Sequence, residues 1–336
     1  MATAARVPTM RDVADRAGVS AMTVSRVLHG DRRVSVESRR AILDAVGALG
    51  YRRNEAARAL RTGQSGDLVG LVITNLANPF YSQLAVGVER FTSAHSQHVL
   101  IGNSGEDPAR EAQLLSEFIA QGVSGIIVVP SVGAFDALTP DRLNGLPVVL
   151  ATTPAERGGM DSVVVDDSGG ADALTSALIA DGHARIGYIG FPTTSWTGRE
   201  RLRGFRAALD RAGLGVQDDL VALTVPDARA AERAAFHLLN RSDPPTALLA
   251  ANNRITLGTY RAIRRSGHHT PLAGFDDVEF ADLLDHPLIV GAYDASDLGE
   301  TAARMLHERA SQQITPGTPA RSTRVPVVLK RYNSSR

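Results

Sequence analysis

The sequence predicts a small all-α domain with a helix-turn-helix, followed by a two-lobed α/β domain built on parallel sheets. Its 336 residues are enough for two or three domains, and 43% of them are apolar, which suits a sizeable core. Residues 1–63 hold twelve arginines and six acids, a net charge of +6, whereas the other 273 residues hold 24 basic and 30 acidic side chains, a net charge of −6. From Leu68 onward, β-branched runs alternate with helical stretches.

The charge asymmetry is typical of a polyanion-binding head on a different body, and it favours nucleic acid as the partner. A solvated basic helical face would give the same count, so charge alone leaves both interpretations open. Cysteine is absent, which excludes disulfides and cysteine metal sites and fits a reducing cytoplasm. Met1–Met10 lacks the apolar core of a secretory signal, and no apolar run approaches the ~20 residues of a membrane span. We therefore expect a cytoplasmic protein.

Short helices are predicted over the first 63 residues. Apolar residues at helical spacing and stopping glycines place them at 10–17, from Ser20 to about His29, and from about Val36 to Gly50. Ser20 is a natural N-cap for the second helix, with Thr23 at its third position. Because a short turn containing Gly18 joins the first two helices, we expect a helix-turn-helix. Asn54 caps a further short segment, and 64–67 is the predicted linker.

The remainder is predicted to form parallel sheets. The predicted strands are Leu68–Ile73, Val99–Gly102, Ile126–Val129, Val148–Ala151, Val163–Val165, Ile186–Ile189, Leu220–Thr224, Ala247–Ala250, Leu272–Phe275 and Leu288–Ala292. The predicted helices lie near Ser82–Thr92, Glu111–Gln121, Ala171–Ala180, Arg199–Ala212, Arg229–Asn240 and Ile255–Ser266. Continuous apolar strands between helices indicate parallel sheets covered on both faces, and two groups of strands indicate two similar lobes.

The segment Thr9–Leu28 resembles the N-terminal signature of the LacI/GalR family of bacterial transcription regulators. The resemblance spans essentially the whole chain, through Val34-Ser35, Tyr51, Asn54, Ala57–Leu60, Asn78–Tyr81, Gly182–Gly187, Arg201–Phe205, Leu257-Gly258 and Gly274–Asp277. It implies a DNA-binding domain over 8–63, with the helix-turn-helix at 10–29 and a hinge helix at 54–62, and an effector-binding and dimerisation domain over 68–336. The second domain would be similar to periplasmic binding proteins, with lobe 1 at about 68–165 and 294–323 and lobe 2 at about 166–293 and 324–336.

Members of this family bind palindromic operator DNA as dimers, and a small effector held between the lobes changes that affinity. The resemblance therefore implies a homodimeric transcription regulator, expected to be a repressor, that works at the nucleoid and needs no cofactor. An activator, or a regulator that binds DNA without any effector, remains open.

The second helix of a helix-turn-helix lies in the major groove, with its N-terminal residues facing base edges. Here those residues are Ala21 and Met22, whose apolar side chains suit methyl contacts, for example to thymine. Arg26 matches a base-reading arginine of the family, although a phosphate contact or a salt bridge would also engage it. The resemblance adds further DNA-binding residues, several with hydroxyls suited to phosphate: Thr9, Ser20, Thr23, Ser25 and His29.

In the family, two hinge helices pair in the minor groove, where a leucine wedges into the central base step. Leu60 matches that leucine, Ala57 matches a small residue at the helix contact, and Asn54 matches the helix start. A buried core leucine is the alternative for Leu60. Arg53 stands where members usually have proline, so hinge folding is expected to depend more on DNA here.

Ligands of open parallel sheets bind beyond the carboxyl ends of the strands. The segments that follow predicted strands include Asn75–Tyr81, Asp166-Asp167, Phe191–Arg201, Asn252-Asn253 and Asp276-Asp277. They offer aromatic rings, carboxylates, amides and a guanidinium, which suit a sugar or another polar ring. The family resemblance selects as effector contacts Phe80, Tyr81, Asp166, Arg201, Asn252, Asp276 and Tyr293, and Trp196 lies in the loop that leads to Arg201. Each alone would also suit a structural role.

We expect the effector to be a sugar or sugar phosphate, with a purine as the less favoured class. Signature motifs of hydrolases, metalloproteases and nucleotide-binding enzymes are absent from the sequence, so we expect no enzyme. A transport-type sugar-binding protein has a similar body, but the missing secretory signal and the basic helix-turn-helix argue against it. His268 and His269 are adjacent and face apart, with no further ligand spaced to complete a metal site. One departure from the family is Asn253, where members commonly carry aspartate.

Overall fold

The computed structural model describes residues 8–28, 31, 33–50, 67–139, 141–155, 159–225, 227–279, 281–311 and 318–333. Met1–Gln64 and Ser65–Arg336 form two separate compact units. The predicted hinge helix over 54–62, with Asn54, Ala57 and Leu60, lies outside the described residues, as do His29 and residues 64–66 of the predicted linker. Within the described ranges, no helix is both long and apolar enough to cross a membrane.

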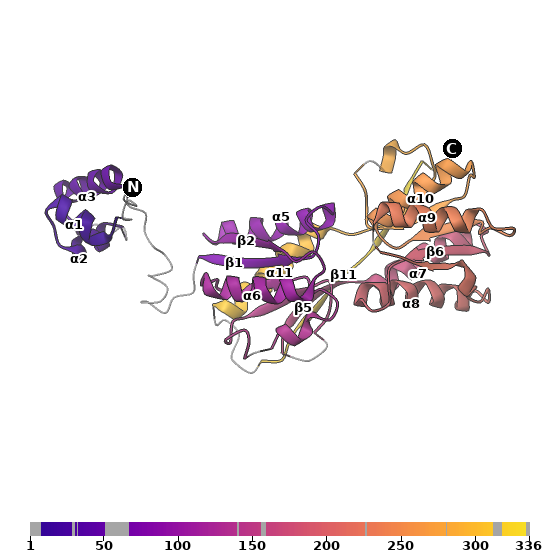
Figure 1. The fold of residues 1–336 in the computed structure, drawn as a ribbon, viewed down its shortest axis with the longest axis horizontal. Coiled ribbons are helices and arrows are strands. Elements are labelled where there is room, and N and C mark those ends of the chain that lie inside the picture. Colours follow the sequence, from indigo (N-terminus) through magenta and orange to yellow (C-terminus); the bar gives the residue numbers. More distant parts are fainter. Residues whose placement is uncertain are drawn as a thin grey trace, which may run out of the picture. The chain divides into compact units, whose positions relative to one another are not determined.

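The first unit contains three short helices, α1 (Met10–Ala17), α2 (Ala21–Leu28) and α3 (Val36–Leu49) (Figure 1). Gly18 and Gly50 end α1 and α3 at φ of +66° and +62°, a left-handed conformation that favours glycine. Val13, Val24 and Ile42, one from each helix, meet in a small buried core. The predicted helix-turn-helix is therefore confirmed, with α2 ending at Leu28 among the described residues.

The second unit is built on two six-stranded sheets. Sheet A consists of β1 (Leu68–Ile73), β2 (His98–Asn103), β3 (Ile126–Val128), β4 (Val148–Ala151), β5 (Asp161–Val165) and β11 (Ser322–Val325), in the order β11-β5-β4-β3-β1-β2. Sheet B consists of β6 (Ile186–Gly190), β7 (Val221–Leu223), β8 (Ala247–Ala250), β9 (Leu272–Phe275), β10 (Leu288–Ala292) and β12 (Val328–Tyr332), in the order β12-β10-β9-β8-β6-β7. All paired strands run parallel except β10 and β12.

Helices cover both faces of each sheet (Figure 1). Those on sheet A are α5 (Pro79–Ala94), α6 (Pro108–Ala120) and α11 (Ala295–Ala310), and those on sheet B are α7 (Asp167–Ala180), α8 (Trp196–Arg211), α9 (Ala228–Leu239) and α10 (Asn253–Ser266). Short 3-10 turns occur at η1 (Ala134–Ala137), η2 (Asp218–Leu220) and η3 (Ala281–Leu283). Neighbouring residues of β1 point to opposite faces, so Leu71 packs with Leu84 of α5 whereas Val72 packs with Phe118 of α6.

The predicted alternation of strands and helices in two lobes is confirmed, but some elements were not predicted, one strand runs antiparallel, and Trp196 belongs to a helix. The helix α11 and the strands β11 and β12 were not predicted, and β12 runs antiparallel. Helix α8 begins at Trp196, which is therefore its first residue rather than part of a loop. The chain passes from one sheet to the other after β5, after β10 and after β11, so three segments connect the lobes.

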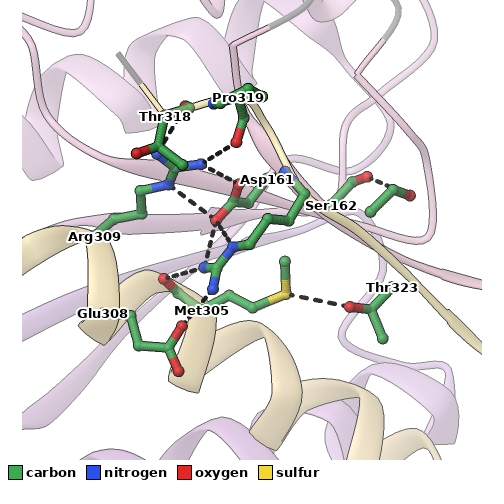
Figure 2. A network of polar contacts seen from close by, with 10 residues as sticks. Asp161, Ser162, Met305, Glu308, Arg309, Thr318, Pro319 and Thr323 are labelled. Carbon is green, nitrogen blue, oxygen red and sulfur yellow. Dashed lines mark hydrogen bonds and ion pairs between the residues drawn. The ribbon is translucent and has the colours of Figure 1, made fainter. Parts of the chain in front are cut away.

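A polar network fastens β11 to the rest of sheet A (Figure 2). The side chain of Asp161, the first residue of β5, is fully buried and accepts hydrogen bonds from Arg309 of α11 and from Arg321, which directly precedes β11. Glu308 pairs with Arg321, and the carbonyls of Thr318 and Pro319 accept from Arg309. One carboxylate thus joins three segments that are far apart in the sequence.

Candidate functional site

In the first unit, the residues predicted to read DNA lie at the start of α2. The hydroxyl of Ser20 accepts a hydrogen bond from the Thr23 N–H at 3.2 Å and lies 2.9 Å from Thr23 Oγ1, so this pair caps the helix as predicted. Ala21 and Met22 are exposed, Met22 by 68% of its surface. Arg26 is exposed one helical turn after Met22, on the same side of α2. Ala21, Met22 and Arg26 therefore form one accessible face.

Thr9 and Ser25, the other described members of the predicted set, lie in different environments. Thr9 caps α1: its N–H donates to Asp12 Oδ2 at 2.6 Å, and its hydroxyl accepts from the Asp12 N–H at 3.4 Å. Ser25 is half-buried within α2. The structure thus brings the described residues of the predicted DNA-binding set to α2 and to the start of α1.

In the second unit, a cavity of about 550 Å³, here called the cleft, is lined by residues that follow strands of both sheets. They include residues from 74–81 after β1, 129–136 after β3, 191–201 after β6, and Asn252 after β8. The strand order reverses between β1 and β3 in sheet A and between β6 and β8 in sheet B. Such reversal points, beyond the carboxyl ends of parallel strands, are where ligands bind in open α/β sheets.

Arg201 of α8 lies at the floor of the cleft between two carboxylates. Its Nε donates to Asp167 Oδ1 at 2.8 Å, its Nη2 lies 3.3 Å from Asp276 Oδ1, and its Nη1 donates to the carbonyl of Ala251. The guanidinium also stacks on Phe275, with its carbon 3.6 Å from the ring centroid. These contacts engage all three nitrogens of the guanidinium.

Burial and neighbouring charges shift the pKa values of Asp167 and Arg201. It raises the pKa of Asp167 to about 6, although the charge of Arg201 opposes the rise. Burial alone would lower the pKa of Arg201, but the charges of Asp276 and Asp167 outweigh it and raise that pKa. Arg201 therefore stays charged, and the pKa of Asp167 lies closer to neutral pH than that of an ordinary aspartate.

Aromatic side chains cover another part of the cleft. Phe80 makes edge contacts with Tyr81 and Tyr293, at centroid distances of 5.0 and 6.1 Å. The Tyr293 hydroxyl donates to Asp276 Oδ1 at 2.8 Å, and the Thr74 hydroxyl donates to that of Tyr81 at 2.7 Å. Burial raises the pKa of Tyr81 to about 12, so it stays protonated.

The other predicted contacts occupy three different positions. Asn252 caps α10 by accepting from the Ile255 N–H at 2.8 Å, and it also lines the cleft. Trp196 is half-buried in the lining, with the Arg199 guanidinium 5.3 Å from its ring centroid. Asp166 lies outside the lining: it caps α7 and pairs with Arg324.

Comparison with known proteins identifies the family of both parts of the chain. Residues 9–54 match the family "Bacterial regulatory proteins, lacI family", and residues 66–331 match "Periplasmic binding proteins and sugar binding domain of LacI family". The chain belongs to the LacI family. The maltose regulon regulatory protein MalI of Escherichia coli is 32% identical over 329 residues, which cover 94% of either chain.

Two solved structures extend the similarity to the whole fold. The lac repressor dimer bound to operator and the anti-inducer ONPF gives a TM-score of 0.83 at 25% identity, covering 98% of this chain and 100% of that one. A putative ribose operon repressor from Burkholderia thailandensis gives 0.72 at 31% identity, covering 79% and 98%. This LacI-family chain is a DNA-binding transcriptional regulator with a two-lobed second domain.

Sequence reasoning about this LacI-family cleft overlooked one wall. Residues Ser131, Val132, Gly133, Phe135 and Asp136 follow β3, and Thr152 and Thr153 follow β4; all of them line the cleft. Both strands were predicted, so applying the carboxyl-end rule to them as well would have found these residues.

Proposed function

We propose that the chain is a homodimeric repressor that binds a palindromic operator and is controlled by a sugar in the cleft. It acts on the nucleoid in the cytoplasm and catalyses no reaction. One helix-turn-helix reads only a half-site, so a palindrome needs two copies. Among the relatives, the "Ribose operon repressor" of Escherichia coli is 31% identical over 325 residues, and the similar regulator CelR, 27% identical, was solved with cellobiose.

The charge balance of the cleft is the observation that decides which class of effector we propose. Its lining contains four carboxylates, Glu106, Asp136, Asp167 and Asp276, and, among the described residues, one guanidinium, Arg201, which is already paired. A phosphate would bring further negative charge into this lining, which disfavours it. An uncharged sugar can donate its hydroxyls to the carboxylates and lay its apolar face on Phe80 or Trp196. We therefore favour a neutral sugar over a sugar phosphate.

The proposed operator contacts come from the domain over 8–63. Ala21, Met22 and Arg26 would meet base edges in the major groove. The proposed phosphate and supporting contacts come from Thr9, Ser20, Thr23, Ser25 and His29. A hinge helix over 54–62 would start at Asn54, pack at Ala57 and place Leu60 in the minor groove. A linker at 64–67 would join it to the effector domain over 68–336, where Tyr293 completes the proposed effector contacts. Asp166 is no longer among them, because it caps α7 outside the cleft lining.

Fluorescence of Trp196, the only tryptophan, tests the effector site. Ribose, maltose, cellobiose and adenine are titrated while its emission is followed, and a sugar that changes the emission is added to a gel shift. The DNA for the gel shift is selected from a random pool by the full chain. We expect the sugar to change operator affinity by about 5–150-fold, the usual range of coupling between two sites.

Two variants and a truncation provide the controls. Arg201→Lys and Asp276→Asn should weaken sugar binding, whereas a sugar that binds both variants as tightly as the native chain would refute this site. Removal of residues 1–63 should leave a sugar-binding protein without operator affinity. Operator binding by the truncated chain would refute the DNA assignment.

A further inference from the structure

Glu111 is a buried carboxyl directly behind the cleft, and the contacts proposed above do not use it. It lies in the first turn of α6 and is 0% exposed. Its Oε2 accepts a hydrogen bond from the Ser131 N–H at 2.7 Å. Its Oε1 is buried and has no hydrogen-bond partner within the described part of the chain. Burying a carboxyl oxygen without a partner costs free energy, so its presence here calls for an explanation.

Ser131 is the point at which the overlooked cleft wall is attached to the fold. Its N–H is held by Glu111, and its hydroxyl lies 3.1 Å from the hydroxyl of Ser104, which donates to the Ile73 carbonyl at 3.3 Å. Ser131 and Ser104 are both buried. These polar contacts join the wall to α6 on one side and to the end of β1 on the other.

The residues after Ser131 line the cleft, and part of them is supported by the 3-10 turn η1 and by the packing of Phe135 on the core of the sheet A lobe. Val132, Gly133 and Phe135 line the cavity, and Val132 is 51% exposed. Gly133 has a φ of +82°, a left-handed conformation that the chain adopts readily only with glycine. The start of this wall segment, residues 131–136, therefore depends on how firmly Ser131 is held.

We propose that Glu111 is a positioning residue for effector binding, which fixes Ser131 and thereby the 131–136 wall of the cleft. The inference rests on the proposed effector site. A wall that is already ordered costs less free energy to immobilise when a ligand binds, so the contact raises affinity without touching the ligand. Burial raises the pKa of Glu111 above its ordinary value, although the Ser131 N–H and hydroxyl oppose the rise. Glu111 consequently keeps its proton to a higher pH than an exposed glutamate does, which reduces the cost of its unpartnered oxygen.

Hydrogen exchange of the full chain, followed by mass spectrometry without any ligand, tests the positioning role. Glu111→Leu keeps the bulk and removes the acceptor, whereas Glu111→Gln keeps an acceptor oxygen for the Ser131 N–H. We expect the peptide over 130–136 to exchange about tenfold faster in Glu111→Leu and near the native rate in Glu111→Gln. Peptides from β1 and β4 should exchange at the native rate in both variants.

Leu115→Ala is the matched control. Leu115 lies one turn further along α6, is 3% exposed and packs in the core of the sheet A lobe, so its truncation loosens the lobe without removing the Glu111 contact. A native exchange rate over 130–136 in Glu111→Leu would overturn the proposal. Equal acceleration in Leu115→Ala, or in Glu111→Gln, would overturn it as well, because general loosening or charge loss would then explain the effect.

A sugar found by the Trp196 titration then links the wall to binding. Its dissociation constant should rise about tenfold in Glu111→Leu and stay near the native value in Glu111→Gln, whereas equal values in all three proteins would overturn the role in binding. Failure of every sugar would count against the proposed effector, while the ligand-free exchange rates would still decide whether Glu111 holds the wall.

Discussion

Replacing Asp161 by asparagine should lower the free energy of unfolding of the second unit by about 3 kcal/mol. The side chain is 0% exposed, and its oxygens accept from Arg309 at 2.7 and 3.1 Å and from Arg321 at 2.6 and 3.1 Å (Figure 2). Removing one partner of a buried ion pair typically costs about 3–5 kcal/mol. The lower end applies here, because Arg309 and Arg321 are 18% and 35% exposed and keep other acceptors.

Urea unfolding of the full chain, followed by circular dichroism, measures this loss, with Asp181→Asn as the matched control. Asp181 also pairs with an arginine through two hydrogen bonds, to Arg331 at 2.7 and 3.2 Å, but this pair is 41% and 45% exposed. Such surface pairs contribute about 0–1 kcal/mol. Equally small losses in Asp161→Asn and Asp181→Asn would refute the reasoning that the buried carboxylate holds β11 in place.

The pH dependence offers a second readout of the same variant. Burial alone would raise the pKa of Asp161, but hydrogen bonds from Arg309 and Arg321 outweigh it, and the pKa lies below its ordinary value. A lowered pKa contributes stability above the unfolded-state pKa of about 3.9, and that stability is lost as the pH falls through the folded-state pKa. The native chain should therefore lose more stability than Asp161→Asn when the pH falls below about 4.

Three further predictions concern the two sites. Arg26→Ala should relax operator specificity at one base pair per half-site and cost about 1–3 kcal/mol; in gel shifts with single-base operator variants, a uniform loss would instead indicate a phosphate contact. Arg201→Gln removes the cation that pairs with the buried carboxylates of Asp167 and Asp276, so it should cost about 3–5 kcal/mol of stability at pH 8. Burial already raises the pKa of Asp167 to about 6, so this carboxyl takes up a proton at pH 5 and the loss of stability should be smaller there. Equal losses at both pH values in urea unfolding would contradict this reasoning. Asn253→Asp removes the side-chain N–H that Asn253 donates to Asn78 Oδ1 at 2.8 Å, so urea unfolding should show that the free energy of unfolding falls by about 1–3 kcal/mol. An unchanged free energy of unfolding would show that the contact is dispensable.

Strong local patterns made most of the fold predictable from the sequence. The apolar run Leu68–Ile73 forms a strand with the predicted ends, because it is buried on both faces of sheet A. The missed helix α11 buries small residues such as Gly299 and Ala302, which carry a weak apolar signal, and Gly299 packs closely against the backbone of α5. The missed strands β11 and β12 are mostly exposed. Since β11 pairs with β5, about 160 positions earlier, only the tertiary fold determines it.

For the cleft, the rule that ligands bind beyond the carboxyl ends of strands predicts the right segments but not every residue within them. It led to the segments that contain Arg201, Asn252 and Asp276, because each segment follows a strand whose position the sequence revealed, and the family resemblance selected the residues within them. It could not distinguish Asp166 from Asp167. Asp166 caps α7 through the Gly169 N–H at 3.3 Å, whereas Asp167 turns to Arg201, and this choice depends on the local entry of the chain into the helix.

Asn253 stands where LacI-family members commonly carry aspartate, and a hydrogen bond between the two lobes explains this difference. Asn78 Oδ1 caps α5 by accepting from the Phe80 N–H at 3.1 Å, and the same oxygen accepts from Asn253 Nδ2 at 2.8 Å. The side chain of an aspartate at 253 has no N–H to donate, so one of its oxygens would face the Oδ1 acceptor of Asn78. The backbone N–H of Asn253 also donates to Asp276 Oδ2 at 3.4 Å, and Asp276 in turn pairs with Arg201. Asp276 and Arg201 of the cleft therefore belong to the same network of polar contacts as the hydrogen bond between Asn78 and Asn253, which joins the two lobes.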